Sequence, residues 1–267
     1  IYKKKYKFKI GVLTFDPIPK MFFNPKFKNY RISSFDQKLN FLNNFNVDFI
    51  INKKFDLKFS KIKYFNFIKE IIHKKIQPRY IFVSNNFRFG NKREGDVKSL
   101  IEYSNQFNYR IINPKPLKKK SKIISSSLIR TLLEKGNIKL ANKYLNRNWS
   151  IEGIIQVGRK LGRKIGFPTC NIDIKDYIIA KPGVYAVKVF LGKSEKLKLG
   201  IANLGYRPTF NQNKILLEVN IFNFSKNIYR NKIRVEFIEF IRGEKKFKNI
   251  NQLKKQIDKD ILDCKKS

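Results

Sequence analysis

The feature that most constrains the fold is a change of sequence pattern near residue 147. After Trp149, strand-like segments follow one another with turns between them, at 151–157, 184–190, 197–203, 214–222 and 233–240. Consecutive strands without intervening helices favour an antiparallel sheet that closes into a barrel. A final helix is expected over 249–264, where Leu253, Ile257 and Ile261 share one face.

The first half of the chain instead alternates strands with helices. Strands are expected at 7–15, 47–51 (a buried strand), 79–84 and 109–112, and helices at 34–45, 64–74, 96–107, 125–133 and 137–145. Ser34 and Gln37 have the spacing of a capping box, and Gly136 is a natural residue after a helix end. Such alternation predicts a parallel sheet with helices on both faces. We therefore expect two domains, 1–147 and 148–267.

Composition excludes several classes of protein. Of the 267 residues, 42% are hydrophobic and 14% aromatic, which is typical of a folded chain. No apolar run is long enough to span a membrane, and the first residues lack the apolar core of a signal peptide. The two cysteines, Cys170 and Cys264, do not suggest a disulfide framework, and the single His73 has no metal-site spacing around it. These features favour a cytoplasmic protein.

The net charge of +39 raises the question of nucleic-acid binding. The charge is spread along the chain, with 34 basic and 9 acidic residues in 1–150 and 25 and 11 in 151–267. The surplus of Lys, Asn, Ile, Phe and Tyr is typical of an AT-rich genome. We therefore expect no specific nucleic-acid partner. A basic RNA-associated binding protein remains the alternative, and it would require Lys and Arg to gather on one surface.

Three glycines, Gly158, Gly162 and Gly166, follow one another at intervals of four residues. Glycine lets the backbone approach a ligand closely, and successive N–H groups in such a loop form a concavity that suits phosphate. The spacing does not match a P-loop. A basic, glycine-rich β-turn without a ligand is the alternative.

The same segment continues through Pro168, Thr169 and Asn171. In an extended segment, Thr169 and Asn171 would point to the same side, because strand side chains alternate. Two neutral oxygen ligands side by side suit Mg²⁺, which also contacts substrate phosphates.

This glycine-rich segment resembles the signature of riboflavin kinases. The resemblance continues through Gly183-Val184-Tyr185, 200–205, Arg207-Pro208-Thr209-Phe210, Leu217-Glu218-Val219, Tyr229 and Ile241-Arg242-x-Glu244-x-x-Phe247. With the preceding half, the chain resembles the bacterial bifunctional riboflavin kinase/FMN adenylyltransferase (FAD synthetase) family. The resemblance implies a Rossmann-like nucleotidyltransferase domain followed by an antiparallel β-barrel kinase domain with a terminal helix.

For the kinase, the resemblance implies that ATP phosphates bind at Gly158, Gly162, Gly166 and Pro168, and that Mg²⁺ binds at Thr169 and Asn171. Strand alternation places Glu218 on the face opposite Leu217 and Val219. The resemblance makes Glu218 the catalytic base that takes the proton of the riboflavin 5′-hydroxyl. From the residues alone, a solvated strand glutamate is the alternative. The substrates of the two activities that the resemblance implies would be riboflavin, FMN and ATP.

For the adenylyltransferase, the resemblance implies nucleotide binding by Asn86, Ser125, Ser126 and Arg130. Serines at a helix start and an arginine suit phosphate, but an ordinary helix cap is the alternative. Ile18 and Asn86 stand where the family has His and Asp, which favours the further alternative of a kinase alone.

The family's Gly-x-Phe-Asp-Gly-x-His-x-Gly-His motif has no match. Because the chain begins with Ile1 rather than Met, we expect a fragment whose adenylyltransferase site is incomplete.

Overall fold

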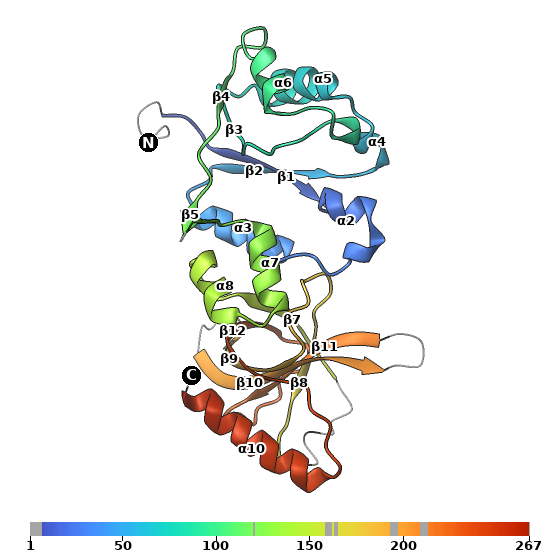
Figure 1. Ribbon diagram of the computed structural model, residues 1–267, viewed down its shortest axis with the longest axis vertical. Coiled ribbons are helices and arrows are strands. Elements are labelled where there is room, and N and C mark those ends of the chain that lie inside the picture. The colour runs from blue at the N-terminus through green and yellow to red at the C-terminus, as the bar shows by residue number, and fades with distance from the viewer. Residues whose placement is uncertain are drawn as a thin grey trace. The chain divides into compact units, whose positions relative to one another are not determined.

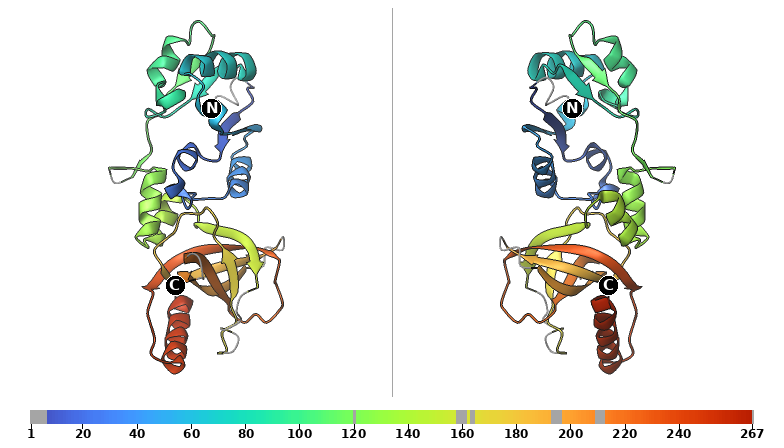
Figure 2. Two further views of the ribbon diagram at one scale, coloured as in Figure 1. Left: turned by 90° about the vertical axis from the view of Figure 1, so that its right-hand side faces the viewer. Right: turned by 90° about the vertical axis from the view of Figure 1, so that its left-hand side faces the viewer.

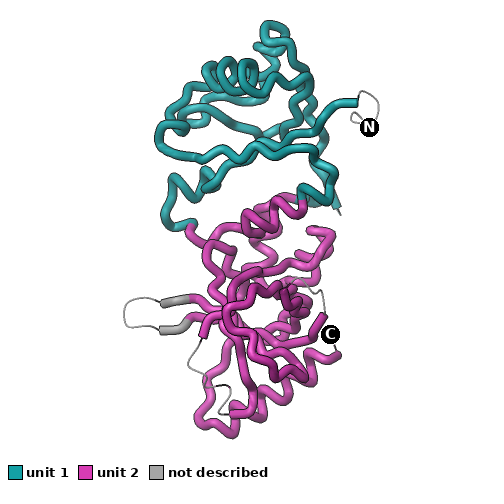
Figure 3. Tube along the Cα trace, turned by 180° about the vertical axis from the view of Figure 1, so that it is seen from behind, with its two compact units in different colours: residues 1–27, 42–124 teal, residues 28–41, 125–267 magenta. Residues whose placement is uncertain are grey.

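The computed structural model describes residues 7–119, 121–157, 162, 165–192, 197–208 and 213–266 (Figure 1). The chain forms two compact units, which Figure 3 distinguishes by colour. Unit 1 comprises residues 1–27 and 42–124, and unit 2 comprises residues 28–41 and 125–267. Two segments of the N-terminal half, 28–41 and 125–147, therefore belong to the same compact unit as the barrel. The domain boundary near residue 147 stays a prediction.

Unit 1 contains the four predicted strands, and they pair in parallel as predicted. Strand β1 (Gly11–Asp16) pairs with β2 (Phe49–Lys54), and β3 (Tyr80–Phe82) pairs with β4 (Arg110–Ile112). In the described part of the chain these remain two separate two-stranded sheets rather than the single sheet we expected. The sequence pattern identifies extended segments, but the path of the chain decides which of them share hydrogen bonds.

Strand β2 also differs from the prediction that it is buried. Phe49 is 43% exposed, and Lys53 and Lys54 are exposed as well. The strand begins two residues later than the apolar run suggested and extends into polar and charged residues. The apolar run thus predicted the strand but not its environment.

The other elements of unit 1 are short. They are α2 (Pro19–Phe23), η1 (Pro25–Phe27), α4 (Leu57–Ser60), α5 (Tyr64–Asn66), the π-helix η2 (Phe67–Ile76), η3 (Asn91–Arg93), α6 (Val97–Glu102), β5 (Lys118–Lys119) and β6 (Lys122–Ile123). Helix α3 (Phe35–Asn44) continues from unit 2 into unit 1. The core of unit 1 is formed by buried residues of η2 and its neighbours, including Phe67, Ile68, Ile72 and Leu100.

Helix α6 ends five residues before the predicted end. Its start is a capping box between Asp96 and Ser99. After Glu102, the Ser104 hydroxyl donates to the Ile101 carbonyl at 2.6 Å. A local side-chain bond of this kind offers the backbone an alternative to continued helix, so turns follow up to Asn108.

In unit 2, helices α7 (Ser126–Glu134) and α8 (Ile138–Leu145) form as predicted. Gly136 lies between them with φ of 75°, and its N–H donates to the Leu133 carbonyl at 2.9 Å. The capping box of α3 is also confirmed, because the backbone N–H of each of Ser34 and Gln37 donates to the side chain of the other.

The barrel contains six strands, in the order β10-β11-β8-β7-β12-β9. They are β7 (Ser150–Gln156), β8 (Cys170–Asp173), β9 (Gly183–Leu191), β10 (Leu197–Pro208), β11 (Asn213–Ile221) and β12 (Lys232–Gly243), and all neighbours are antiparallel. The five predicted strands and the closed antiparallel barrel are thus confirmed. Strand β8 is additional and has only four residues, too few for a clear alternation.

The barrel has an apolar inside, to which helices α7 and α8 add buried side chains. The segment 28–41 docks here too, since the Trp149 indole donates to the Ile32 carbonyl at 2.8 Å. The predicted terminal helix is α10 (Ile250–Lys266), and its Cys264 packs on Val184, Ala186 and Ile201 of the outer barrel face. Figures 1 and 2 show α10 on the side of the barrel away from α7 and α8.

Among the helices that the structure describes, none combines the length and apolarity that crossing a membrane requires.

Candidate active site

A row of polar residues crosses four neighbouring strands of the barrel. The register places Gln156 of β7 opposite Asn171 of β8, Asn171 opposite Glu218 of β11, and Glu218 opposite Asn203 of β10. Directly opposite residues in antiparallel strands lie on the same face, with Cβ atoms about 4.5–5.5 Å apart. The predicted metal ligand Asn171 and the predicted base Glu218 are therefore neighbours.

The polar row lies on the face opposite the barrel core. Leu217, Val219 and Ile221 belong to that core, as strand alternation predicted for β11. Glu218 is half-buried on the other face. Sequence reasoning missed Gln156 and Asn203, because only the strand register shows that they stand beside the predicted residues.

The side-chain oxygen of Asn171 is buried and has no hydrogen-bond partner among the residues that the structure describes. Buried polar atoms in folded proteins nearly always have a partner, so an exception needs an explanation. A neutral amide oxygen is a ligand that Mg²⁺ accepts. The residues present thus fit the predicted cation.

The glycine-rich segment folds close to Thr169. A Cβ atom at Gly162 would collide with the Phe167 carbonyl oxygen and would lie 3.3 Å from Thr169 Oγ1. The Phe167 N–H donates to the Gly162 carbonyl at 2.8 Å, which fixes this approach. Gly166 adopts φ of 90°, a conformation that favours glycine.

Of the three predicted glycines, Gly162 is thus placed near the predicted metal ligand Thr169. Gly158 and the basic residues Arg159, Lys160, Arg163 and Lys164 lie outside the described residues.

Asn220 supports the segment from the neighbouring strand. Its side-chain amide donates to the Pro168 carbonyl at 2.7 Å. Asn220 is two positions from Glu218 on β11 and therefore points to the same side. Pro168 is exposed and Thr169 half-buried at this edge of the barrel. Asn220 was not among the predicted site residues.

Cys170 separates Thr169 from Asn171 but faces the barrel interior. Burial raises the pKa of its thiol to about 12, and the thiol donates to the Val219 carbonyl at 3.4 Å. A protonated, buried thiol is a poor nucleophile. Cys170 is therefore a packing residue of the barrel core.

Comparison with known proteins identifies the family. A riboflavin kinase family model matches residues 145–267, and an FAD synthetase family model matches residues 2–128. The bifunctional riboflavin kinase/FMN adenylyltransferase of Buchnera aphidicola (subsp. Schizaphis graminum) is 39% identical over all of this chain and 86% of its own length. The chain belongs to this bifunctional family.

Two further comparisons cover nearly the whole chain. The Haemophilus influenzae bifunctional riboflavin kinase/FMN adenylyltransferase is 36% identical over 96% of this chain and 83% of its own length. A crystal structure of a Streptococcus pneumoniae protein, named a macrolide-efflux protein, is similar with a TM-score of 0.83 and 26% identity, over 97% of this chain and 84% of that one. The likeness in sequence to the first and in structure to the second thus extends through both halves of the chain.

Three of the four residues predicted for the family's adenylyltransferase site lie in unit 2, and two of them have structural roles there. Ser125 is the N-cap of α7 and accepts a hydrogen bond from the Leu128 N–H at 3.2 Å, whereas Ser126 is exposed. Arg130 Nε donates to the Tyr30 carbonyl at 2.8 Å, and the guanidinium lies 3.6 Å from the centre of the Tyr30 ring. Burial lowers the pKa of Arg130.

Asn86, the fourth predicted residue of the adenylyltransferase site, lies in unit 1. It is exposed and accepts a hydrogen bond from the Ser84 hydroxyl at 2.8 Å. For Ser125, the hydrogen bond to the Leu128 N–H confirms the alternative interpretation as a helix cap. The roles of all four residues in nucleotide binding stay predictions.

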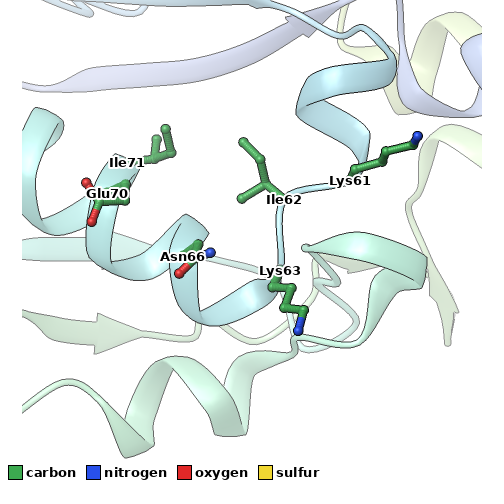
Figure 4. A pocket seen from close by; sticks show the side chains of 6 residues that line it. All are labelled: Lys61, Ile62, Lys63, Asn66, Glu70 and Ile71. Carbon is green, nitrogen blue, oxygen red and sulfur yellow. The ribbon is translucent and has the colours of Figure 1, made fainter.

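Unit 1 also contains a pocket of about 530 Å³, lined by Lys61, Ile62, Lys63, Asn66, Glu70 and Ile71. Figure 4 shows the amines of Lys61 and Lys63 pointing away from the two isoleucines, and Glu70 pairs with Lys74 at 2.9 Å. None of the residues predicted for either activity of the family lines this pocket. The described residues also contain no group of three or more His, Cys, Asp or Glu that could hold a metal ion.

Proposed function

We propose that this chain phosphorylates riboflavin with ATP to give FMN, and that it adenylylates FMN to give FAD. Both halves of the chain match family models of these activities, and relatives that carry both names are 36–39% identical. The observation that carries the kinase proposal is the buried, unsatisfied Asn171 oxygen directly opposite Glu218.

In the kinase reaction, Glu218 accepts the proton of the riboflavin 5′-hydroxyl while the 5′-oxygen bonds to the γ-phosphorus of ATP. The bond from that phosphorus to the ADP oxygen breaks, and ADP leaves with its electrons. Because phosphoryl transfer needs little covalent work from the protein, positioning of the hydroxyl and neutralisation of charge supply most of the catalysis. Glu218 contributes as a general base.

Thr169 and Asn171 would hold Mg²⁺, which neutralises phosphate charge when bound. The backbone around Gly158, Gly162, Gly166 and Pro168 would hold the ATP phosphates. Asn220 keeps the Pro168 carbonyl in place. The loop thus positions ATP on the same edge of the barrel as the base.

In the adenylylation, an FMN phosphate oxygen attacks the α-phosphorus of ATP and pyrophosphate leaves. Asn86, Ser125, Ser126 and Arg130 are the proposed nucleotide-binding residues. Ser126 is exposed at the start of α7, where helix N–H groups favour an anion. We also propose a cytoplasmic location, which the two free, buried cysteines support.

The test is flavin chromatography after incubation of the protein with riboflavin, ATP and Mg²⁺. We expect FMN to appear first and FAD to follow. FMN without FAD would restrict the activity to the kinase, and unchanged riboflavin with a folded protein would remove the kinase assignment. Matched reactions with EDTA test the Mg²⁺ requirement, and reactions started from FMN test adenylylation by itself.

A further inference from the structure

Helix α10 carries a buried acidic residue. Asp260 is 2% exposed, and it shares a helix face with Gln256 and Cys264, which lie one turn before and one turn after it. This is the face that packs on the outer surface of the barrel. Burying a carboxylate is costly unless it is paired and hydrogen-bonded, so the partners of Asp260 define its role.

The main partner of Asp260 is Arg242, near the end of β12. Arg242 Nε donates to both carboxylate oxygens at 2.9 and 3.0 Å, and Nη2 donates at 2.7 Å. The Gln256 amide completes the set at 2.8 Å. Such a two-pronged arginine–carboxylate pair fixes direction as well as distance.

Arg242 also fixes the backbone that leaves the barrel. Its Nη1 donates to the Gly243 carbonyl at 2.9 Å. The Arg242 carbonyl in turn packs on Gly183, where a Cβ atom would collide with it. The point at which β12 ends is thus held from α10 on one side and from β9 on the other.

The next residue along the chain is Glu244, whose carboxylate lies against Gly205 of β10. A Cβ atom at Gly205 would collide with Glu244 Oε1 and would lie 3.6 Å from Asn203 Nδ2. Asn203 is the residue directly opposite Glu218. Glu244 therefore lies beside the polar row that contains the proposed base, and it is exposed there.

We propose that Asp260 is a positioning residue of the kinase. Through Arg242 it holds Glu244 against Gly205, where the Glu244 carboxylate accepts a hydrogen bond from a hydroxyl or N–H group of riboflavin. This inference rests on the proposed kinase activity. It assigns to the terminal helix a part in substrate binding, although Asp260 itself touches no substrate.

The test compares three variants of this chain, and a fourth as a control, with the wild type. Glu244→Gln and Asp260→Asn should each raise the KM for riboflavin about tenfold, as expected for loss of one hydrogen bond to a charged group, and leave kcat and the KM for ATP nearly unchanged. The double variant should be no worse than either single one, because both changes remove the same contact. Asp258→Asn on the same helix is exposed and serves as the control.

The outcomes separate this inference from the proposed function. Wild-type protein that forms no FMN overturns the kinase itself. With an active wild type, an unchanged KM in Glu244→Gln overturns the proposed contact between Glu244 and riboflavin. An unchanged KM in Asp260→Asn, or additive effects in the double variant, overturns the positioning role of Asp260. Adenylylation of supplied FMN should be the same in all variants, which a general loss of structure would not allow.

If Asp260→Asn does not fold, Arg242→Lys replaces it in the comparison. Lysine keeps the charge but cannot bond Asp260 twice and Gly243 at the same time. The same rise in KM for riboflavin is expected, and an unchanged KM contradicts the proposal.

Discussion

The two regions predicted to bind phosphate differ in what their polar groups do within the folded chain. At the barrel edge, the Asn171 oxygen is buried and has no partner among the described residues. At the start of α7, Ser125 caps the helix. Arg130 donates a hydrogen bond to the Tyr30 carbonyl, and its guanidinium stacks on the Tyr30 ring. The first region keeps a strong hydrogen-bond acceptor unsatisfied, whereas the second uses two of its three predicted residues to stabilise unit 2.

This difference separates the two regions although their residue types are similar. A buried polar atom without a partner costs free energy, which makes Asn171 the stronger candidate for contact with a ligand. A serine that caps a helix contributes to stability whether or not a ligand binds. The following experiments probe this contrast, in order of decreasing expected effect.

The largest effect is expected at the proposed base. Glu218→Gln should lower kcat for riboflavin phosphorylation by about 10²–10⁴-fold, because the proton acceptor is lost while the side chain keeps its shape. Adenylylation of supplied FMN should be unchanged. Steady-state kinetics of both reactions measure this, with Glu239→Gln of β12 as the control, since Glu239 pairs with Lys139 at 2.7 Å and is not among the residues proposed for either reaction. An equal loss in the control would contradict a specific role for Glu218.

Substitution of Asn171 should raise the stability of the protein and weaken its use of Mg²⁺. Asn171→Leu replaces an unsatisfied acceptor by an apolar side chain of similar size, so the free energy of unfolding should rise by about 1–3 kcal/mol. The Mg²⁺ concentration needed for half-maximal kinase rate should rise as well. Urea unfolding and Mg²⁺ titrations test the two effects.

Asn220→Leu is the matched control for Asn171→Leu. It removes an amide that is already bonded to the Pro168 carbonyl, so it should destabilise the protein by about 1 kcal/mol. If both variants are destabilised equally, the Asn171 oxygen is not an unsatisfied acceptor in the folded protein.

Ser125 and Ser126 provide a matched pair at the start of α7. Ser125→Ala removes the N-cap hydrogen bond and should destabilise unit 2 by about 1 kcal/mol. Ser126→Ala should leave the midpoint of thermal unfolding unchanged and lower the rate of FMN adenylylation. If Ser126→Ala has no effect on adenylylation, the proposed nucleotide contact is absent and the helix-cap interpretation accounts for the motif.

The smallest effect concerns alkaline pH. Burial raises the pKa of both Cys170 and Cys264 from 9.0 to about 12. The unfolded chain therefore loses these protons first, so the contribution of the two thiols to stability is constant below about pH 9 and falls as the pH rises from 9 toward 12. Urea midpoints measured at pH 8, 9 and 10 test this, and a Cys170→Ala/Cys264→Ala variant should show a shallower decline. An identical decline in the variant would assign the effect to other groups.

Much of the barrel could be predicted because its strands alternate apolar and polar residues. The face on which Glu218 lies followed from the apolar positions of Leu217 and Val219 alone. Strand β8 did not follow, because four residues of which only Cys170 and Ile172 face the core give too short a pattern. In unit 1, the strands were predictable but their sheet partners were not, since strand pairing depends on contacts distant in sequence.

The sequence by itself determined the order of the elements, the glycine-rich segment and the types of residue needed for phosphate, Mg²⁺ and proton transfer. Only the tertiary structure decided which of these residues are neighbours. The pairing of Asn171 with Glu218, the position of Asn203 beside them and the Arg242–Asp260 pair all join residues of different elements. Periodicity predicts which side of its own helix or strand a residue faces. The strand register and the packing of α10 determine which residues it contacts on that side.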